Sequence, residues 1–382
     1  MSTVQEDDML SSQPIPKRQK FEPDKHLFVC FMASVTPLNP MWYAVKSVSL
    51  SSLSGGSSSE HDNRLQDVVE WSDTTLPDAM GFGRAGDILY GVGGVIYDEE
   101  SFDYPDQNSM VRELRFTHLP LGGRSYLHSG TRSSMKWGKF LPFVVEIDGL
   151  IYALSRPPIS DYGLLDTAFE VYDPSKNEWT GLDGPPFLSP RTFSAFYYSY
   201  VVIDKKLCVS NPAGSCAFDT ENWTWEACDL FADFYDSDIL SSEEKYSFME
   251  NQEDYKHYLG GDIGPPFPFV EDAIFYEDFL LCNVPDFSPP VVAFEIVRGK
   301  VARRLTLLDN SIQPRASSHF VDLGGGDFCL VSKADECPEE MTVVKFKVWK
   351  GEDGGLGCAD VMESTLKFSA PGRCWTVYVF AL

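Results

Sequence analysis

The chain has 382 residues, with 57 acidic against 31 basic side chains and a formal net charge of −26. Attraction to a phosphate backbone needs clustered Lys and Arg, so this charge argues against nucleic acid and anionic membrane surfaces as partners. Glycine and proline are frequent, at 29 and 25 residues, and aromatics are plentiful, which favours an all-β protein with many turns.

The sequence shows no sign of export or membrane insertion. It has no run of 18 or more apolar residues, and residues 1–8 contain neither the basic nor the apolar part of a signal peptide. We therefore expect a cytoplasmic or nuclear protein. The nine cysteines never form a Cys-x-x-Cys pair, so we interpret them as reduced thiols that pack in strands, without a disulfide framework or a zinc site.

Residues 1–26 are polar and acidic, and we interpret them as a disordered arm. They contain the cluster Lys17-Arg18-Gln19-Lys20. Two interpretations of this cluster stay open: a nuclear localisation signal, or part of a solvated tail. The remaining chain, residues 27–382, has the pattern of one β-rich domain.

The first apolar runs of that domain, Phe28–Met32 and Tyr43–Leu50, predict strands. Val68–Trp71 predicts the next one. Gly86–Gly94 predicts the strand that opens a second unit. Its final pair, Gly93-Gly94, permits a close approach of another backbone and a turn with unusual dihedral angles.

The third unit, residues 139–187, has the clearest strand pattern. Asp148-Gly149 lies between two apolar runs and predicts a hairpin turn. Asp173–Asn177 has the residue types of a second turn. The turns delimit four antiparallel strands, at Phe143–Ile147, Leu150–Leu154, Ala168–Tyr172 and Glu178–Thr180.

Residues 194–228 repeat this pattern. Tyr172-Asp173 is followed by Trp179, seven positions after the tyrosine, and Phe218-Asp219 is followed by Trp225 at the same spacing. A repeated unit of about 45 to 55 residues, built from short apolar runs, predicts a closed array of small sheets.

Two kinds of residue recur in these units. The aromatic residues are Tyr172, Trp179, Phe218 and Trp225. They could stack on a ligand, but their matched positions in successive units favour packing between blades. The acidic residues are Asp173 and Asp219, and we expect them to accept backbone hydrogen bonds in the turns that follow their strands.

The repeat is interrupted by a long acidic insertion at about residues 229–265. Between 229 and 262 only Lys245 and Lys256 oppose ten acids: Asp229, Asp233, Asp236, Asp238, Glu243, Glu244, Glu250, Glu253, Asp254 and Asp262. Because loops carry function more often than the scaffold does, this insertion is the candidate contact surface for a basic partner. A disordered loop without a binding role is the alternative.

Two further units follow the insertion. The fifth begins near Phe267, and the sixth contains the run Thr342–Trp349. The last run, Arg373–Ala381, has no unit of its own, whereas the first unit shows only three strands. Since a closed ring leaves no exposed edge, we predict that this strand completes the first blade; an edge strand packed elsewhere is the alternative.

Four segments, Gly86–Gly94, Asp148–Tyr152, Val171–Trp179 and Pro190-Arg191, resemble the kelch repeat. The chain after the arm resembles a plant-type kelch β-propeller, related in fold to the central domain of galactose oxidase. The resemblance implies an all-β ring of four-stranded blades, six in number or between five and seven, whose loops bind another protein. In the third unit, Ser155-Arg156 stands where the family has a glycine pair.

Many plant members of that family carry an F-box before the propeller, which recruits a ubiquitin ligase core. Residues 1–26 are too short for this three-helix module, so we expect a propeller without an F-box. An alternative function stays open: the protein could be the substrate-recognition subunit of a ubiquitin ligase and join that ligase without an F-box.

A copper site like that of galactose oxidase needs converging histidines and tyrosines, with a cysteine crosslinked to a tyrosine. The six histidines are scattered: His26, His61, His118, His128, His257 and His319. None has ligand spacing, so the sequence predicts no catalytic, cofactor-binding or metal-binding residue. Gly324–Gly326 leads into a strand, so we interpret it as a hairpin turn rather than a phosphate-binding loop.

Arg191, just beyond a blade, could face the central channel or form a salt bridge between blades. The function that these patterns favour is a non-catalytic platform for protein–protein interactions. We expect it to be a monomer whose partner carries a basic surface. An enzyme on a scaffold like that of galactose oxidase is the alternative.

Overall fold

We describe the protein from a computed structural model. It describes residues 25–34, 41–53, 64–73, 76–96, 110–119, 133–156, 168–186, 199–211, 214–235, 239–241, 264–269, 271–284, 287, 289–309, 318–333, 339–352, 354–370 and 374–382. The arm at residues 1–24 and most of the acidic insertion lie outside these ranges.

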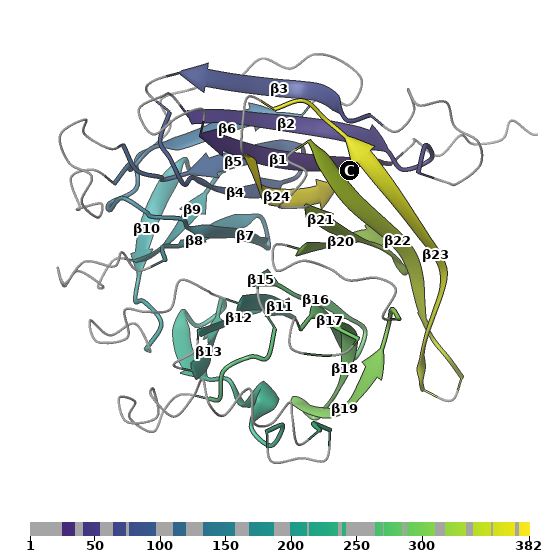
Figure 1. Ribbon diagram of the computed structural model, residues 1–382. Coiled ribbons are helices and arrows are strands. Elements are labelled where there is room, and N and C mark those ends of the chain that lie inside the picture. The colour runs from purple at the N-terminus through teal and green to yellow at the C-terminus, as the bar shows by residue number, and fades with distance from the viewer. Residues whose placement is uncertain are drawn as a thin grey trace, which may run out of the picture.

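The described residues form an all-β ring of six small sheets, the blades of a β-propeller (Figure 1). Four blades have four strands, one has three, and one has four plus a short fifth strand. This confirms the predicted propeller of six blades. The single helical segment among the described residues is the 3-10 turn η1 (Asp229–Phe231).

Blade 1 combines both ends of the described chain. Its strands, in spatial order, are β24 (Cys374–Ala381), β1 (His26–Ser34), β2 (Met41–Ser49) and β3 (Gln66–Asp73). β24 runs antiparallel to β1, with Phe28 opposite Phe380 and Met32 opposite Trp375. The prediction that the last strand completes the first blade is therefore confirmed.

Blade 2 has three strands: β4 (Gly81–Ala85), β5 (Ile88–Val92) and β6 (Leu114–His118). The prediction that Gly86–Gly94 opens this blade is wrong, because β4 precedes it and Gly86-Asp87 forms the turn between β4 and β5. The glycines of β4 gave no strand signal. Beyond β6, the segment 133–139 bonds irregularly to residues 111 and 112 in place of a fourth strand.

Blades 3 and 4 are the two matched sequence units. Blade 3 consists of β7 (Phe143–Ile147), β8 (Leu150–Leu154), β9 (Phe169–Asp173) and β10 (Glu178–Leu182). Blade 4 consists of β11 (Ser199–Ile203), β12 (Lys206–Asn211), β13 (Gly214–Asp219) and β14 (Thr224–Ala227). A fifth strand, β15 (Glu271–Asp272), pairs in parallel with β11 on its channel side.

Blades 5 and 6 complete the ring. Blade 5 consists of β16 (Ile274–Tyr276), β17 (Phe279–Asn283), β18 (Val291–Val297) and β19 (Lys300–Thr306). Blade 6 consists of β20 (Ser318–Gly324), β21 (Asp327–Lys333), β22 (Glu340–Lys350) and β23 (Leu356–Lys367). The long β22–β23 hairpin extends beyond the ring (Figure 1), and Lys350 pairs with Asp278 of blade 5.

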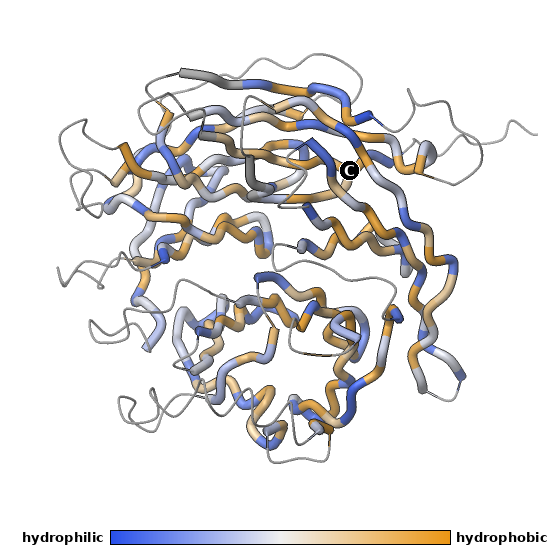
Figure 2. Tube along the Cα trace, viewed as in Figure 1, coloured by the Kyte–Doolittle hydropathy of each residue, from blue (hydrophilic) through white to orange (hydrophobic). Residues whose placement is uncertain are grey.

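The hydrophobic core is divided into clusters that lie between neighbouring blades. The described residues form six such clusters, one for each junction around the ring. Alternate residues of a strand face opposite junctions, so in β8 Ile151 packs toward blade 2 while Tyr152 packs toward blade 4. Figure 2 shows hydrophobic residues recurring along the strands of every blade.

The inner strands of the six blades are β4, β7, β11, β16, β20 and β24, and the short β15 lies on the channel side of β11. Each blade begins with its inner strand, except that β24 comes from the far end of the chain, so all of them start at one end of the channel. We call this the entry end. Gly264, which follows the middle of the acidic insertion, lies at this end, because it bridges Ser215 at the start of β13.

Candidate functional site

Polar and titratable side chains from several blades meet at the entry end of the channel. They form what we call the entry-end cluster: Arg156, Tyr200, Glu271, Asp272, His319 and Tyr378. Arg156 follows β8, Tyr200 lies on β11, the two acids form β15, His319 lies on β20 and Tyr378 on β24. The cluster therefore joins blades 1, 3, 4 and 6.

Strand β15 brings the two carboxylates to the channel wall. Its parallel register sets Glu271 beside Ser199 and Asp272 beside Tyr200. The backbone amide of Ala273, directly after β15, donates a 3.1 Å hydrogen bond to the carbonyl of Tyr200. This bond extends the pairing with β11 by one residue. This pairing occurs directly before β16, where the chain enters blade 5.

Two ion pairs cross the cluster. Arg156 Nη2 lies 3.2 Å from Glu271 Oε2, and His319 Nδ1 lies 3.6 Å from Asp272 Oδ1. The His319 side chain is 12% exposed and that of Asp272 22%, so water screens this pair only in part. Contact across 3.6 Å is electrostatic rather than a short hydrogen bond.

The pKa of His319 is raised above its usual value. Burial alone would lower it, but the interaction with the Asp272 carboxylate and the charge of Glu271 outweigh burial, and the backbone of Thr376 adds to the shift. Protonated His319 is therefore favoured at the channel wall. It links β20 of blade 6 to β15, which pairs with blade 4, on the channel side of blade 5.

Two tyrosines of the cluster are held in the neutral form. Burial raises the pKa of Tyr200 well above its usual value, and the charge of Asp272 adds to this. Burial likewise raises the pKa of Tyr378. The ring of Tyr200 stacks on Phe143 of β7, with centroids 4.9 Å apart. The cluster thus offers neutral phenols, two carboxylates and two cationic groups to whatever enters the channel.

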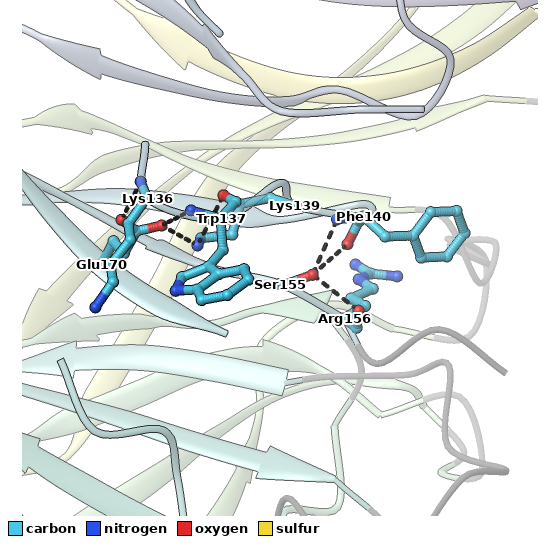
Figure 3. Close-up of polar contacts among 7 residues, drawn as sticks. All are labelled: Lys136, Trp137, Lys139, Phe140, Ser155, Arg156 and Glu170. Carbon is cyan, nitrogen blue, oxygen red and sulfur yellow. Dashed lines mark hydrogen bonds and ion pairs between the residues drawn. The ribbon is translucent and has the colours of Figure 1, made fainter. Parts of the chain in front are cut away.

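The segment that supports Arg156 is anchored by a buried ion pair between blades 2 and 3 (Figure 3). Lys139 pairs with Glu170 of β9, and both side chains are 0% exposed. Glu170 also accepts hydrogen bonds from the backbone amides of Lys136, at 2.8 Å, and Trp137, at 3.4 Å. Burial lowers the pKa of the Lys139 amine, while Glu170 opposes that shift.

Ser155 and Arg156 are bonded to the end of this anchored segment (Figure 3). The hydroxyl of Ser155 accepts a 2.9 Å hydrogen bond from the amide of Phe140, and the amide of Arg156 donates a 2.9 Å bond to the carbonyl of Phe140. The Arg156 backbone is therefore fixed where its guanidinium reaches Glu271. Arg156 occupies the position in blade 3 that Gly94 occupies in blade 2, two residues after the second strand.

The aromatic residues singled out in the repeat pack between blades, as predicted. The Phe218 ring meets Phe169 edge-to-face, with centroids 4.9 Å apart, and lies 5.0 Å from that of Trp225. Tyr172 is buried and its ring contacts those of Trp179 and of Tyr90 in blade 2. These rings are part of the core, and none of the four is in the entry-end cluster.

The predicted roles of the turn residues are also confirmed. In the first turn, Asp173 Oδ1 accepts hydrogen bonds from the amides of Ser175 and Lys176. In the second, Asp219 Oδ1 accepts hydrogen bonds from the amides of Glu221 and Asn222. Gly93 and Gly94 have positive φ angles of 68° and 98°. A Cβ atom on Gly93 would lie 2.7 Å from both the Cβ and the carbonyl oxygen of Lys139, which is the predicted close approach.

Other predictions fall outside the described residues. Arg191, the cluster Lys17–Lys20 and residues 242–263 of the acidic insertion are among them. The beginning of the insertion is described, and it is packed rather than loose: Leu230, Phe231, Phe234 and Leu240 are buried in the core between blades 4 and 5. For this part, the alternative of a disordered loop is wrong, because its apolar side chains fill a blade junction.

The entry-end cluster was not found from the sequence. His319 was noted only as one of six scattered histidines, and Glu271-Asp272 carries no strand signal. The two members of the His319–Asp272 pair are 47 positions apart and lie on different blades, so no local spacing reveals them. Only the ring closure and the parallel register of β15 bring them together.

No group of three or more His, Cys, Asp or Glu side chains could hold a metal ion in the described part of the chain. Within the same residues, no helix is long and apolar enough to span a membrane. The side chains of the entry-end cluster can form hydrogen bonds and ion pairs and can transfer protons.

Comparison with known proteins gives limited results. Residues 128–230, which cover blades 3 and 4, match the family described as "Protein of unknown function (DUF1668)". No curated protein matches the chain by sequence. Among solved structures, the apo AztD of Citrobacter koseri aligns over 94% of this chain and 98% of its own, with 8% identity and a TM-score of 0.32, a likeness too low to bear on function.

Proposed function

We propose that the protein is a non-catalytic interaction propeller that binds a basic segment of a partner protein at the entry end of its channel. The observation that supports this most directly is the position of β15. This strand follows the acidic insertion where the chain rejoins the ring, and its two acids, Glu271 and Asp272, lie on the channel wall.

Charge supports a basic partner. Between the described residues 241 and 264, the sequence holds two lysines against six acids: Glu243, Glu244, Glu250, Glu253, Asp254 and Asp262. The described residue that follows this segment, Gly264, lies at the entry end, so the segment rejoins the ring close to β15. A negative surface around a channel attracts cationic ligands and speeds their association, especially at low salt.

In this proposal the protein acts as a monomer in the cytoplasm or nucleus, with neither nucleic acid nor membrane as a partner. The kelch relationship is part of the same proposal. It rests on the repeat residues of blades 2 and 3 and on the propeller fold.

The test compares two variants of equal net charge. One replaces the six acids at 243–262 by Asn or Gln, which leaves the packed residues 229–235 and 239–241 unchanged. The other neutralises six acids in or next to the inner hairpin turns of the opposite end: Asp87, Asp148, Asp204, Glu277, Asp278 and Asp327. Fluorescence anisotropy measures binding of Lys- and Arg-rich peptides at low and physiological salt.

We expect the first variant to bind at least about tenfold more weakly and to lose most of its salt dependence, while the second retains wild-type affinity. Equal losses in both variants would show only a general effect of net charge and would contradict binding at the entry end. Wild-type affinity in both would place any binding surface elsewhere.

An enzyme is the second candidate, and the His319–Asp272 pair favours it. A histidine next to a carboxylate, with the neutral phenols of Tyr200 and Tyr378 nearby, can transfer protons in a reaction. Oxidation of galactose-type sugars by the purified protein, lost in His319→Gln without loss of peptide binding, would support this function. Elemental analysis of the same sample for copper tests the galactose-oxidase-like form.

A further inference from the structure

The hairpin of β22 and β23 has a face that blade 1 covers only in part. On β22, Met341 and Val343 are buried in the core cluster shared with blade 1. Alternate residues of a strand share a face, so Lys345, Lys347 and Trp349 lie on the same side, further along β22. We call these three residues the hairpin stripe. The hairpin extends beyond the ring here (Figure 1), and the last two residues of the stripe are exposed.

Blade 1 reaches the hairpin only at the level of Val343. There the carbonyl of Leu53 accepts a 3.4 Å hydrogen bond from the hydroxyl of Ser364, the residue of β23 opposite Val343. Further along, Gly357 is opposite Trp349, and a Cβ atom on this glycine would lie 2.5 Å from the indole ring. The indole therefore lies over Gly357, yet Trp349 remains 44% exposed.

The other face of the hairpin is fixed to blade 5. Val348 is buried in the core cluster between blades 5 and 6, and Lys350 pairs with Asp278. Arg303 Nη2 donates a 3.4 Å hydrogen bond to the carbonyl of Gly354 in the hairpin turn. The stripe is thus presented by an element that is already held in place, which lowers the entropic cost of binding.

The stripe is basic in a strongly acidic protein. Lys345 and Lys347 form no ion pair with another described residue. The residues opposite them on β21 are Cys329 and Asp327, so two lysines face one acid. A ligand that carries carboxylates and an apolar side chain complements two ammonium groups and an indole.

The N-terminal arm joins the ring beside this surface. Lys25, the first described residue, donates a hydrogen bond from its Nζ to the carbonyl of Leu323 in β20, and its own carbonyl accepts one from the amide of Leu50. Leu323 belongs to the core cluster between blades 6 and 1, so Lys25 lies on the side of blade 6 that carries the stripe. From β20 to β22 there are two strand spacings, about 10 Å.

The sequence of the arm has the chemistry that the stripe requires. Glu6-Asp7-Asp8 is followed by the apolar pair Met9-Leu10. These residues are at least 15 positions before Lys25, and 15 residues span up to about 50 Å when extended, which is more than the stripe requires. Because the arm is attached beside the stripe, its effective concentration there is high, so weak contacts suffice.

We propose that residues 6–10 of the arm bind the hairpin stripe of the same chain. The carboxylates of this segment pair with Lys345 and Lys347, and its apolar pair packs on the indole of Trp349. The stripe lies at the end of the ring opposite the entry end. This contact is therefore independent of the proposed binding of a basic segment, and either can fail without the other.

The experiment is hydroxyl-radical footprinting of the full-length protein, with oxidation of single tryptophans measured by mass spectrometry. Trp223, in the turn between β13 and β14, is the matched reference because it is 45% exposed. Trp349 should be oxidised at least about threefold more slowly than Trp223, since the arm covers it. Replacing Glu6, Asp7 and Asp8 together by Gln, Asn and Asn should remove this protection and leave Trp223 unchanged.

A second segment provides the control. Residues 54–63 lie between Leu53 and Arg64, which both contact β23, and they contain Glu60 and Asp62. Glu60→Gln with Asp62→Asn should leave Trp349 protected. Loss of protection in this control but not in the arm variant would assign the stripe to residues 54–63 and overturn the proposal. Equal oxidation of Trp349 and Trp223 in the wild type would also overturn it.

A second measurement uses only the wild type. A carbodiimide couples carboxylates directly to amines that they contact, and mixing isotopically labelled with unlabelled protein separates crosslinks within a chain from those between copies. We expect residues 6–8 to couple to Lys345 and Lys347 within one chain. Lys176, a 70% exposed lysine of blade 3, is the control and should not couple to the arm. Coupling between copies, or equal coupling to Lys176, contradicts the proposal.

Discussion

The two junctions on either side of blade 3 are built from different chemistry. Toward blade 4, the rings of Phe169, Phe218 and Trp225 pack edge-to-face or tilted, with centroids 4.9 to 5.5 Å apart. Toward blade 2, the buried Lys139–Glu170 pair joins the blades, close to the backbone contact at Gly93.

The difference lies in how each junction tolerates change. Aromatic packing is spread over several rings, and each contributes moderately through its buried area and ring contacts. In a buried ion pair, the attraction between two groups offsets the cost of removing both from water. Removal of one group leaves the other as an uncompensated buried charge. A single substitution in the ion pair toward blade 2 should therefore lower the unfolding free energy more than a single substitution in the aromatic junction toward blade 4.

The largest expected effect comes from Lys139→Met. It leaves the Glu170 carboxylate buried without its counter-ion, so we expect a loss of about 3–5 kcal/mol in unfolding free energy, measured by urea denaturation. The control is Lys46→Met, whose lysine is also buried but whose partner Asp67 is 69% exposed; this change should cost less than about 1 kcal/mol. Similar losses in both variants would refute the contrast between the junctions.

Gly93→Ala should follow in size. The alanine would adopt a φ of 68° and bring its Cβ to 2.7 Å from Lys139 Cβ, so we expect a cost of about 2–4 kcal/mol. Gly86→Ala is the matched control, because its φ is 59° but nothing lies within 4 Å of the added atom. It should cost about 1–2 kcal/mol. An equal cost at both sites would mean that backbone strain alone matters.

Phe218→Leu tests the aromatic junction and should cost about 1–2 kcal/mol, since the apolar volume is largely kept while ring contacts are lost. A double-mutant cycle with Phe169→Leu should give a coupling of about 0.5–1.5 kcal/mol for the edge-to-face pair. Strict additivity of the two changes would show that the rings act only through buried area.

The smallest expected effect concerns the polar link at the channel. Because the pKa of folded His319 is raised by Asp272 and Glu271, its contribution to stability is complete below the pKa of the unfolded state and is lost as pH rises through the raised value. The stability advantage of wild type over His319→Gln should thus shrink between pH 5.5 and 8.5, by less than about 1 kcal/mol for this partly exposed pair. Urea midpoints at the two pH values measure it, and an advantage that grows with pH contradicts the assignment.

The aromatic junction could be predicted from the sequence, because Phe218 and Trp225 recur at the spacing of Tyr172 and Trp179 and so carry a periodic signal. The polar junction could not. Lys139 lies in an irregular segment, and Glu170 occupies a position in β9 that the pattern alone would give to an apolar residue. The burial of each side chain makes sense only because it pairs with the other, and this ion pair forms only when blades 2 and 3 pack together.

The same reasoning applies to the entry-end cluster. Six blades and the pairing of the last strand with the first followed from repeat rhythm and from the need to leave no sheet edge open. Strand β15 is only two residues long and consists of acids with low strand propensity, so its pairing with β11 depends on tertiary context. His319 and Arg156 have ion-pair partners in the cluster only because this strand places Asp272 and Glu271 beside them.

The pairing of β24 with β1 also constrains how the protein is made. At roughly 5 to 20 residues per second of synthesis, β1 leaves the ribosome tens of seconds before its partner strand is translated, about 350 positions later. During that interval the apolar residues of β1 lack one neighbour, and the nascent ring is open at this seam. We therefore expect chaperones to bind newly made molecules mainly at the exposed edge of β1, until β24 is synthesised and pairs with it.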